Sequence, residues 1–144
     1  KLMGDMCYTE HHSLGRVIVA VDRDNHTVQC VSVEKNNILW TVTGTVGERI
    51  MNPCSVAVTP GGCVVIVDRS NRVIEFGLED GRYIGTILTA NADGLHLPWQ
   101  IRYDMHNGSL VLWHYHNNDF LSWYRITSSS NMARSESIDK ILFL

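Results

Sequence analysis

The sequence predicts an all-β chain made of three copies of one unit, and two sets of evenly spaced runs support this prediction. Three apolar runs begin 46 residues apart, and each follows a turn that contains Gly or Asn. After a polar corner, a second run follows in each unit with the same 46-residue spacing. Equivalent positions are Val17, Cys63 and Ser109 in the first runs, and Val28, Ile74 and Phe120 in the second runs.

Each unit has the composition of short antiparallel strands, because its runs are rich in Val, Ile and aromatic residues. In the middle unit, strands are expected at 55–58, 63–67, 73–78 and 83–88, with Pro60-Gly61-Gly62 as the first turn. Four short strands in 46 residues are typical of one blade of a β-propeller. We therefore predict a partial β-propeller of about three four-stranded antiparallel blades, arranged as an open arc.

We expect one domain over residues 1–144, and its blades at approximately 8–42, 53–88 and 98–126. A polar stretch, 127–131, stands where the third unit should begin its fourth strand. The tail, 127–144, could return as that strand or dock as a short helix, and no other segment shows a helical period.

Composition excludes several classes of protein. With 44% hydrophobic residues the chain is too apolar for disorder, and a net charge of −3 argues against coating nucleic acid by charge alone. No apolar run approaches the roughly 18–20 residues that cross a bilayer, so we expect no membrane partner. Because position 1 is Lys, the chain is expected to be a piece of something longer.

The middle unit contains four segments that together form a family pattern, Asn52–Val58, Gly61-Gly62, Val65–Phe76 and Asp80–Ile84. With these segments the middle unit resembles an NHL repeat, and the two outer units keep parts of the same pattern. The first unit keeps Val21-Asp22 but has His26 where an Arg would stand, and the third has His114 where the Asp belongs.

NHL propellers commonly end tripartite-motif (TRIM) proteins, including invertebrate ones, after zinc-binding RING and B-box domains and a coiled coil. The resemblance implies a cytoplasmic, non-catalytic recognition module that binds a protein partner, as the substrate-selecting end of a TRIM-type ubiquitin ligase. Any ligase activity would then reside in domains absent from this chain. One alternative is single-stranded RNA binding by the propeller face, and a second is part of a calcium-dependent, six-bladed propeller hydrolase.

Two groups of residues are assigned roles at the blade corners. An Asp that ends a strand accepts N–H bonds of the turn, and Asn tolerates the left-handed conformation, so these residues are interpreted as structural. Exposed aromatic residues and arginines nearby could bind a partner or RNA. The structural residues are Asp22, Asp68 and Asn71, and the candidate binding residues are Arg69, Arg72, Trp99, Arg102 and Tyr115.

No catalytic motif is found, and we expect no catalytic residue, cofactor or bound metal. The four cysteines lack a Cys-x-x-Cys pair and are interpreted as buried apolar residues of an intracellular protein. His114 and His116 could share a metal on one face of a strand, with His96 or Asp119 as a third ligand. A polar corner that has lost its Asp is the interpretation we favour for His114.

An open arc has a consequence for association. Blades bury their faces only against neighbouring blades, so three units leave two apolar faces uncovered. We expect the chain to self-associate and so complete a propeller, or to swap or aggregate.

Overall fold

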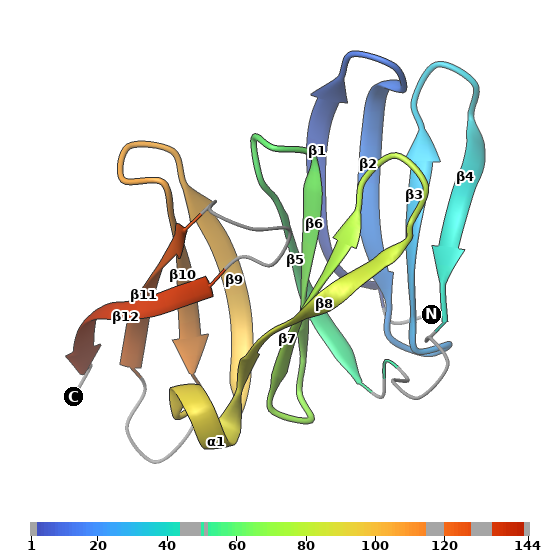
Figure 1. The fold of residues 1–144 in the computed structure, drawn as a ribbon. Helices are drawn as coiled ribbons and strands as arrows, with labels where there is room; N and C mark the ends of the chain where they lie inside the picture. The colour runs from blue at the N-terminus through green and yellow to red at the C-terminus, as the bar shows by residue number, and fades with distance from the viewer. Residues whose placement is uncertain (1–2, 44–49, 51, 115–119, 128–133, 143–144) are drawn as a thin grey trace.

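The computed structural model describes residues 3–43, 50, 52–114, 120–127 and 134–142, and in the last two ranges the side chain of Tyr124 alone is described. These residues form three four-stranded antiparallel sheets. Figure 1 shows the sheets side by side as three blades, with the middle sheet between the other two. The four-stranded units predicted from the 46-residue spacing are therefore present.

The first sheet pairs its strands in chain order, and each strand is antiparallel to the next. It begins at Met3, earlier than the boundary expected at about residue 8, because β1 pairs with β2 along its whole length. The strands are β1 (Met3–His11), β2 (Gly15–Asp22), β3 (Thr27–Ser32) and β4 (Asn37–Val42).

The middle sheet has the same chain-order pairing. A tight turn joins its first two strands, where the backbone N–H of Thr59 donates to the carbonyl of Cys63 and Gly62 has φ of 79°. The strands are β5 (Pro53–Val58), β6 (Cys63–Asp68), β7 (Arg72–Gly77) and β8 (Tyr83–Thr89).

A short helix, α1 (Ala90–Asp93), follows the middle sheet and was not predicted. Thr89 caps it by accepting the N–H of Ala92 at 3.1 Å, and Gly94 ends it with φ of 68°. A helix this short spans about one turn and shows no hydrophobic period in the sequence. Among the described residues, no helix has the length and apolar character to cross a membrane.

The third sheet takes its last strand from the segment set apart as a tail. The tail pairs antiparallel with β11, from Thr127 opposite Arg134 to Phe120 opposite Leu142. Of the two conformations left open for the tail, the structure has the strand. The strands are β9 (Pro98–Asp104), β10 (Ser109–His114), β11 (Phe120–Thr127) and β12 (Arg134–Leu142).

The core lies on both faces of the middle sheet. Alternate residues of β6 point to opposite faces, so Val64 and Ile66 pack toward the first sheet while Val65 and Val67 pack toward the third. All four side chains are buried. The middle sheet therefore joins two separate hydrophobic clusters, one with each neighbour.

The first strand of each sheet is the innermost one in the arc. Strand β5 packs against both β1 and β9, while the second strands β2 and β6 contact the inner strands of the next sheets. The inner strands β1, β5 and β9 thus bring residues from all three sheets together.

The first sheet leaves one face without a neighbouring sheet. Tyr8, Ile18, Val31 and Ile38 lie opposite one another across its four strands, and we call this row the outer apolar row. Tyr8 is 55% exposed and Ile38 is 54% exposed. Its position matches the uncovered face that an open arc implies.

Trp40 of β4 holds the outer edge of the first sheet against the middle sheet. Its indole N–H donates to the carbonyl of Leu78 at 2.7 Å. The ring lies against Gly81, where an added Cβ would come within 2.8 Å of Trp40 Cδ2. Contact with Trp40 therefore requires a residue without a side chain at position 81.

We predict that Gly81→Ala destabilises the fold more than Gly94→Ala. Both glycines have positive φ, 70° and 68°, so both substitutions cost about 1 kcal/mol of backbone strain. Only Gly81 faces a neighbour, since nothing lies within 4 Å of a Cβ at Gly94. The clash with Trp40 should add roughly 1–3 kcal/mol. Urea unfolding measures both, and equal losses would contradict the Trp40 contact.

Candidate functional site

Each inner strand carries a β-bulge near its start. The first residues Met3, Pro53 and Pro98 pair with the last residues of the second strands, and the register then shifts by one residue in all three sheets. A bulge re-aims the side chain of the extra residue. The residues within the bulges are Gly4-Asp5 in β1, Cys54 in β5 and Trp99 in β9.

Asp68 ends β6 and organises the corner beside the middle bulge. Its buried carboxylate accepts the backbone N–H of Ser70 at 2.9 Å and that of Asn52 at 3.2 Å. The second oxygen lies 3.3 Å from Nη2 of Arg72. Since Arg72 is engaged by this buried carboxylate, it belongs to the corner itself.

Asp22 shapes the equivalent corner of the first sheet, and Asn71 completes the corner of the middle sheet. Asp22 accepts the backbone N–H of Asn25 at 3.2 Å and its side-chain amide at 2.8 Å. Asn71 has φ of 63°, and its side-chain oxygen accepts the N–H of Leu97 at 3.0 Å. That bond connects a corner of the middle sheet to the segment before β9, and so helps to place Trp99.

Three side chains from three sheets meet at this end of the inner strands. The guanidinium carbon of Arg69 lies 4.8 Å from the centre of the Trp99 ring, and that of Arg23 lies 5.5 Å from it. Arg23 follows β2, Arg69 follows β6 and Trp99 is in the bulge of β9. We call Arg23, Arg69 and Trp99 the Arg–Trp cluster.

Trp99 remains accessible although two cations stack on it. It is 38% exposed, and both arginines are half-buried. Cation–π contacts of this kind contribute about 0.5–1 kcal/mol each at exposed sites. The cluster is thus an ordered surface that presents one aromatic ring and two positive charges.

Cys54 lies behind the cluster. Three carbonyl oxygens lie within reach of its one thiol hydrogen, that of Trp99 at 3.2 Å and those of Val67 and Pro98 at 3.6 and 3.7 Å. Burial raises the pKa of Cys54 to about 12, although the nearby Arg69 and Arg23 cations oppose that rise. The thiol therefore stays protonated at neutral pH and acts as a packing group.

Of the four cysteines, all free, two differ from expectation. Cys30 and Cys54 are buried as predicted, but Cys7 and Cys63 are only half-buried. Cys7 lies on the innermost strand β1, and Cys63 begins β6 beside a turn, so neither is fully covered by neighbouring strands.

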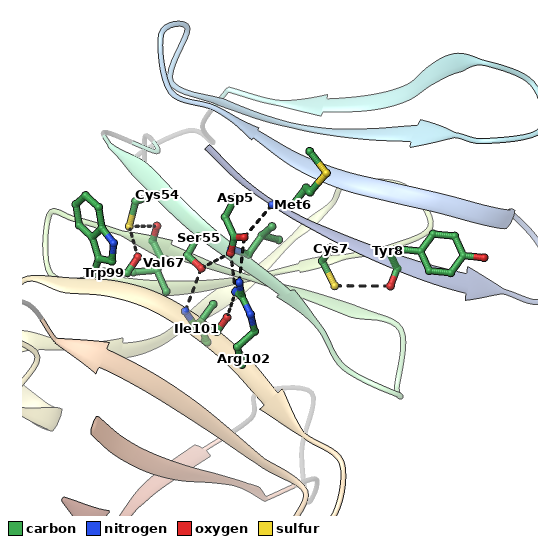
Figure 2. Close-up of polar contacts among 11 residues, drawn as sticks. Asp5, Met6, Cys7, Tyr8, Cys54, Ser55, Val67, Trp99, Ile101 and Arg102 are labelled. Atoms are coloured by element: carbon green, nitrogen blue, oxygen red, sulfur yellow. Dashed lines mark hydrogen bonds and ion pairs between the residues drawn. The ribbon is translucent and has the colours of Figure 1, made fainter. Parts of the chain in front are cut away.

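A second polar group lies further along the inner strands, and Figure 2 shows it between β1, β5 and β9. Asp5 and Arg102 pair at 2.7 and 3.2 Å, and Ser55 donates to Asp5 at 2.6 Å. The Ser55 hydroxyl also accepts the N–H of Ile101 at 3.0 Å. We call Asp5, Ser55 and Arg102 the inner-strand belt, because one residue comes from each sheet.

Asp5 is held in its charged form within the belt. Burial raises the pKa of Asp5, but the hydrogen bonds from Arg102 and Ser55, with the charge of Arg102, outweigh burial and lower it overall. Arg102, predicted as a binding residue, therefore has a carboxylate partner inside the arc.

The third sheet has His114 at its corner in place of an Asp. The side chain is fully buried, and Nδ1 lies 3.3 Å from the carbonyl oxygen of His96. His116 and Asp119, the other proposed metal ligands, lie outside the described residues. Within the described part of the chain, no three His, Cys, Asp or Glu side chains are grouped as a metal would require.

The structure brings together only part of the predicted binding set. Arg69 and Trp99 are in contact, whereas Arg72 and Arg102 pair with carboxylates elsewhere. Tyr115 lies outside the described residues. Arg23 was missed, although it stands 46 residues before Arg69 and so occupies the equivalent position of the repeat.

Comparison with solved structures shows which known folds this chain is similar to. The chain is similar to the structure of U3-55K, with a TM-score of 0.70 and 13% identity over 96% of this chain. It is also similar to the β-propeller domain of Cps50 (Swd1) from Myceliophteria thermophila, with a TM-score of 0.58 and 11% identity over 91% of this chain. Both neighbours are β-propellers, and the predicted partial propeller is confirmed.

The chain spans 38% of the length of each of these two structures. At such low identity the likeness establishes the fold alone. No family model and no curated protein matches the sequence.

Proposed function

We propose that this chain is a non-catalytic recognition module that binds a segment of a partner protein at the Arg–Trp cluster. The observation that supports the proposal is the convergence of Arg23, Arg69 and Trp99, from three different sheets, on one accessible point. Tryptophan and arginine are the residue types that most often dominate binding energy at protein interfaces.

The surroundings of the cluster favour recognition because they are rigid. Arg69 follows the buried Asp68 corner, and Trp99 lies in a bulge whose approach is tied to Asn71. Side chains held in place before binding lose less conformational entropy when a partner arrives. Propeller corners of this kind present variable side chains on a fixed frame.

RNA binding has less support than protein binding. The RNA alternative assigns Arg69, Arg72 and Arg102 to phosphates, but Arg72 and Arg102 are each neutralised by an aspartate. A net charge of −3 also opposes a polyanion. The hydrolase alternative needs free carboxylates on the inner strands, and Asp5 is engaged by Arg102 and Ser55.

The proposal also includes the kind of protein to which this recognition module belongs. The resemblance of the middle unit to an NHL repeat supports a place at the substrate-selecting end of a cytoplasmic TRIM-type ubiquitin ligase. Within that unit, Asp68, Asn71 and Arg72 build one corner, which gives the residues of the resemblance a structural role.

We predict that Trp99→Ala strongly weakens binding to peptides selected by this chain from a random peptide library, whereas Trp113→Ala does not. The two tryptophans are equally exposed, at 38% and 39%, but only Trp99 lies in the cluster. Loss of a central aromatic anchor costs about 2 kcal/mol or more, a reduction in affinity of about thirtyfold. Fluorescence anisotropy measures it, and a library that yields no binder would refute the recognition function.

We also propose that the outer apolar row is covered by a second copy of the chain, which would complete a propeller from two arcs. The outer apolar row runs across all four strands of the first sheet. Both faces of the middle sheet also carry apolar side chains, and those are buried against neighbouring sheets. Exposed apolar surface of this kind favours association at about 25 cal/mol per Å².

We predict that the chain scatters light as a species larger than a monomer at micromolar concentration, and that Tyr8→Lys shifts it toward the monomer. A lysine in the outer apolar row would have to be desolvated at the contact. Met105→Lys is the control, because Met105 is 74% exposed in the turn between β9 and β10. A monodisperse monomer that unfolds cooperatively would exclude this association.

A further inference from the structure

We infer that the Arg–Trp cluster binds an acidic segment of the partner, with Asp or Glu carboxylates on its two guanidinium groups and an apolar side chain against Trp99. This inference rests on the proposed recognition function and names the chemistry of the partner.

The two arginines of the cluster differ from the other arginines whose side chains are described. Neither Arg23 nor Arg69 forms an ion pair with a carboxylate of the described residues. Elsewhere the arginines are paired, and the pairs are Arg16–Glu34, Arg72–Asp68, Arg82–Asp80 and Arg102–Asp5. Among the described arginines, the two without a carboxylate partner therefore lie together at the cluster.

The geometry of the cluster favours an anion. Both guanidinium carbons lie within 5.5 Å of the centre of one ring, so two like charges share one aromatic side chain. Repulsion between them is relieved when a negative group binds. A guanidinium group is planar, and its N–H groups match a carboxylate in a bidentate fashion.

The setting favours a short acidic peptide over a nucleic acid. The Cys54 thiol lies behind the Arg–Trp cluster and is affected by the charges of Asp68 and Asp5 as well as by those of the two arginines. Carboxylates therefore lie close to the cluster on its inner side. A polyanion gains affinity by contacting many cations in succession, and the arginines next in reach, Arg72 and Arg102, are already paired. A short peptide with two carboxylates beside an apolar residue can bind to two arginines and one tryptophan, without the larger basic surface that a nucleic acid requires.

The experiment uses the full chain and a fluorescein-labelled peptide of about twelve residues, rich in Asp and Glu with a central Leu. Its counterpart replaces every Asp and Glu by Asn and Gln. We expect the acidic peptide to bind, and we expect Arg23→Gln and Arg69→Gln each to weaken it about tenfold in anisotropy titrations, as loss of a charge-assisted hydrogen bond implies. Arg82→Gln is the matched control, because Arg82 is exposed in the turn between β7 and β8 and contributes nothing to the cluster.

Salt provides a second readout that needs no variant. Raising the salt concentration from about 50 to about 500 mM should lower the affinity for the acidic peptide and leave any binding of the amide counterpart unchanged. Equal binding of both peptides, or full affinity in the Arg23→Gln, Arg69→Gln double variant, would overturn the inference. Recognition itself would still stand if neutral library peptides bound through Trp99. The inference would also be overturned if single-stranded RNA bound more tightly than the acidic peptide and the double variant lost that binding.

Discussion

The ion pair between Asp5 and Arg102 joins the first sheet to the third, and the rest of the arc depends on the contacts gathered around it. The two residues are 97 positions apart, and Ser55 of the middle sheet donates to the same carboxylate. Apart from this ion pair and the Arg23–Trp99 contact, each outer sheet packs on the middle sheet through its own hydrophobic cluster. Those clusters are non-directional and would tolerate some sliding, whereas a bidentate, shared ion pair specifies one arrangement of the three inner strands.

The same arrangement explains why a recognition surface forms at the ends of the inner strands. Bulges interrupt β1, β5 and β9 at equivalent points, and the re-aimed residues serve two purposes. Asp5 turns into the belt, and Trp99 turns toward the corners that carry Arg23 and Arg69. If the inner strands separated, the belt and the cluster would be lost together. Stability and binding are therefore coupled through the register of three short strands.

Much of the fold could be predicted from the sequence because the repeat is regular where the strands are central. Val28, Ile74 and Phe120 keep a constant spacing, so the second and third strands of each sheet were located. The bulge residues do not keep a constant spacing, since the segments that connect the sheets differ in length. The inner-strand belt therefore could not be recognised in the sequence. Arg69 and Trp99 were chosen separately, and only the structure places them in contact. The pairing of Arg102 with Asp5 could not be foreseen, because Asp5 lies before residue 8, where the first blade was expected to begin.

A double-mutant cycle between Asp5 and Arg102 tests the arc most directly, because these residues can interact only when all three sheets are correctly placed. Asp5→Ala, Arg102→Ala and the double variant would be unfolded in urea alongside the parent chain. The structure predicts a coupling free energy of about 0.5–1 kcal/mol, because the two residues are in direct contact but the Arg102 side chain is 54% exposed. Single-variant losses that add to within about 0.3 kcal/mol would show that the two residues do not meet, and would contradict the three-bladed arc.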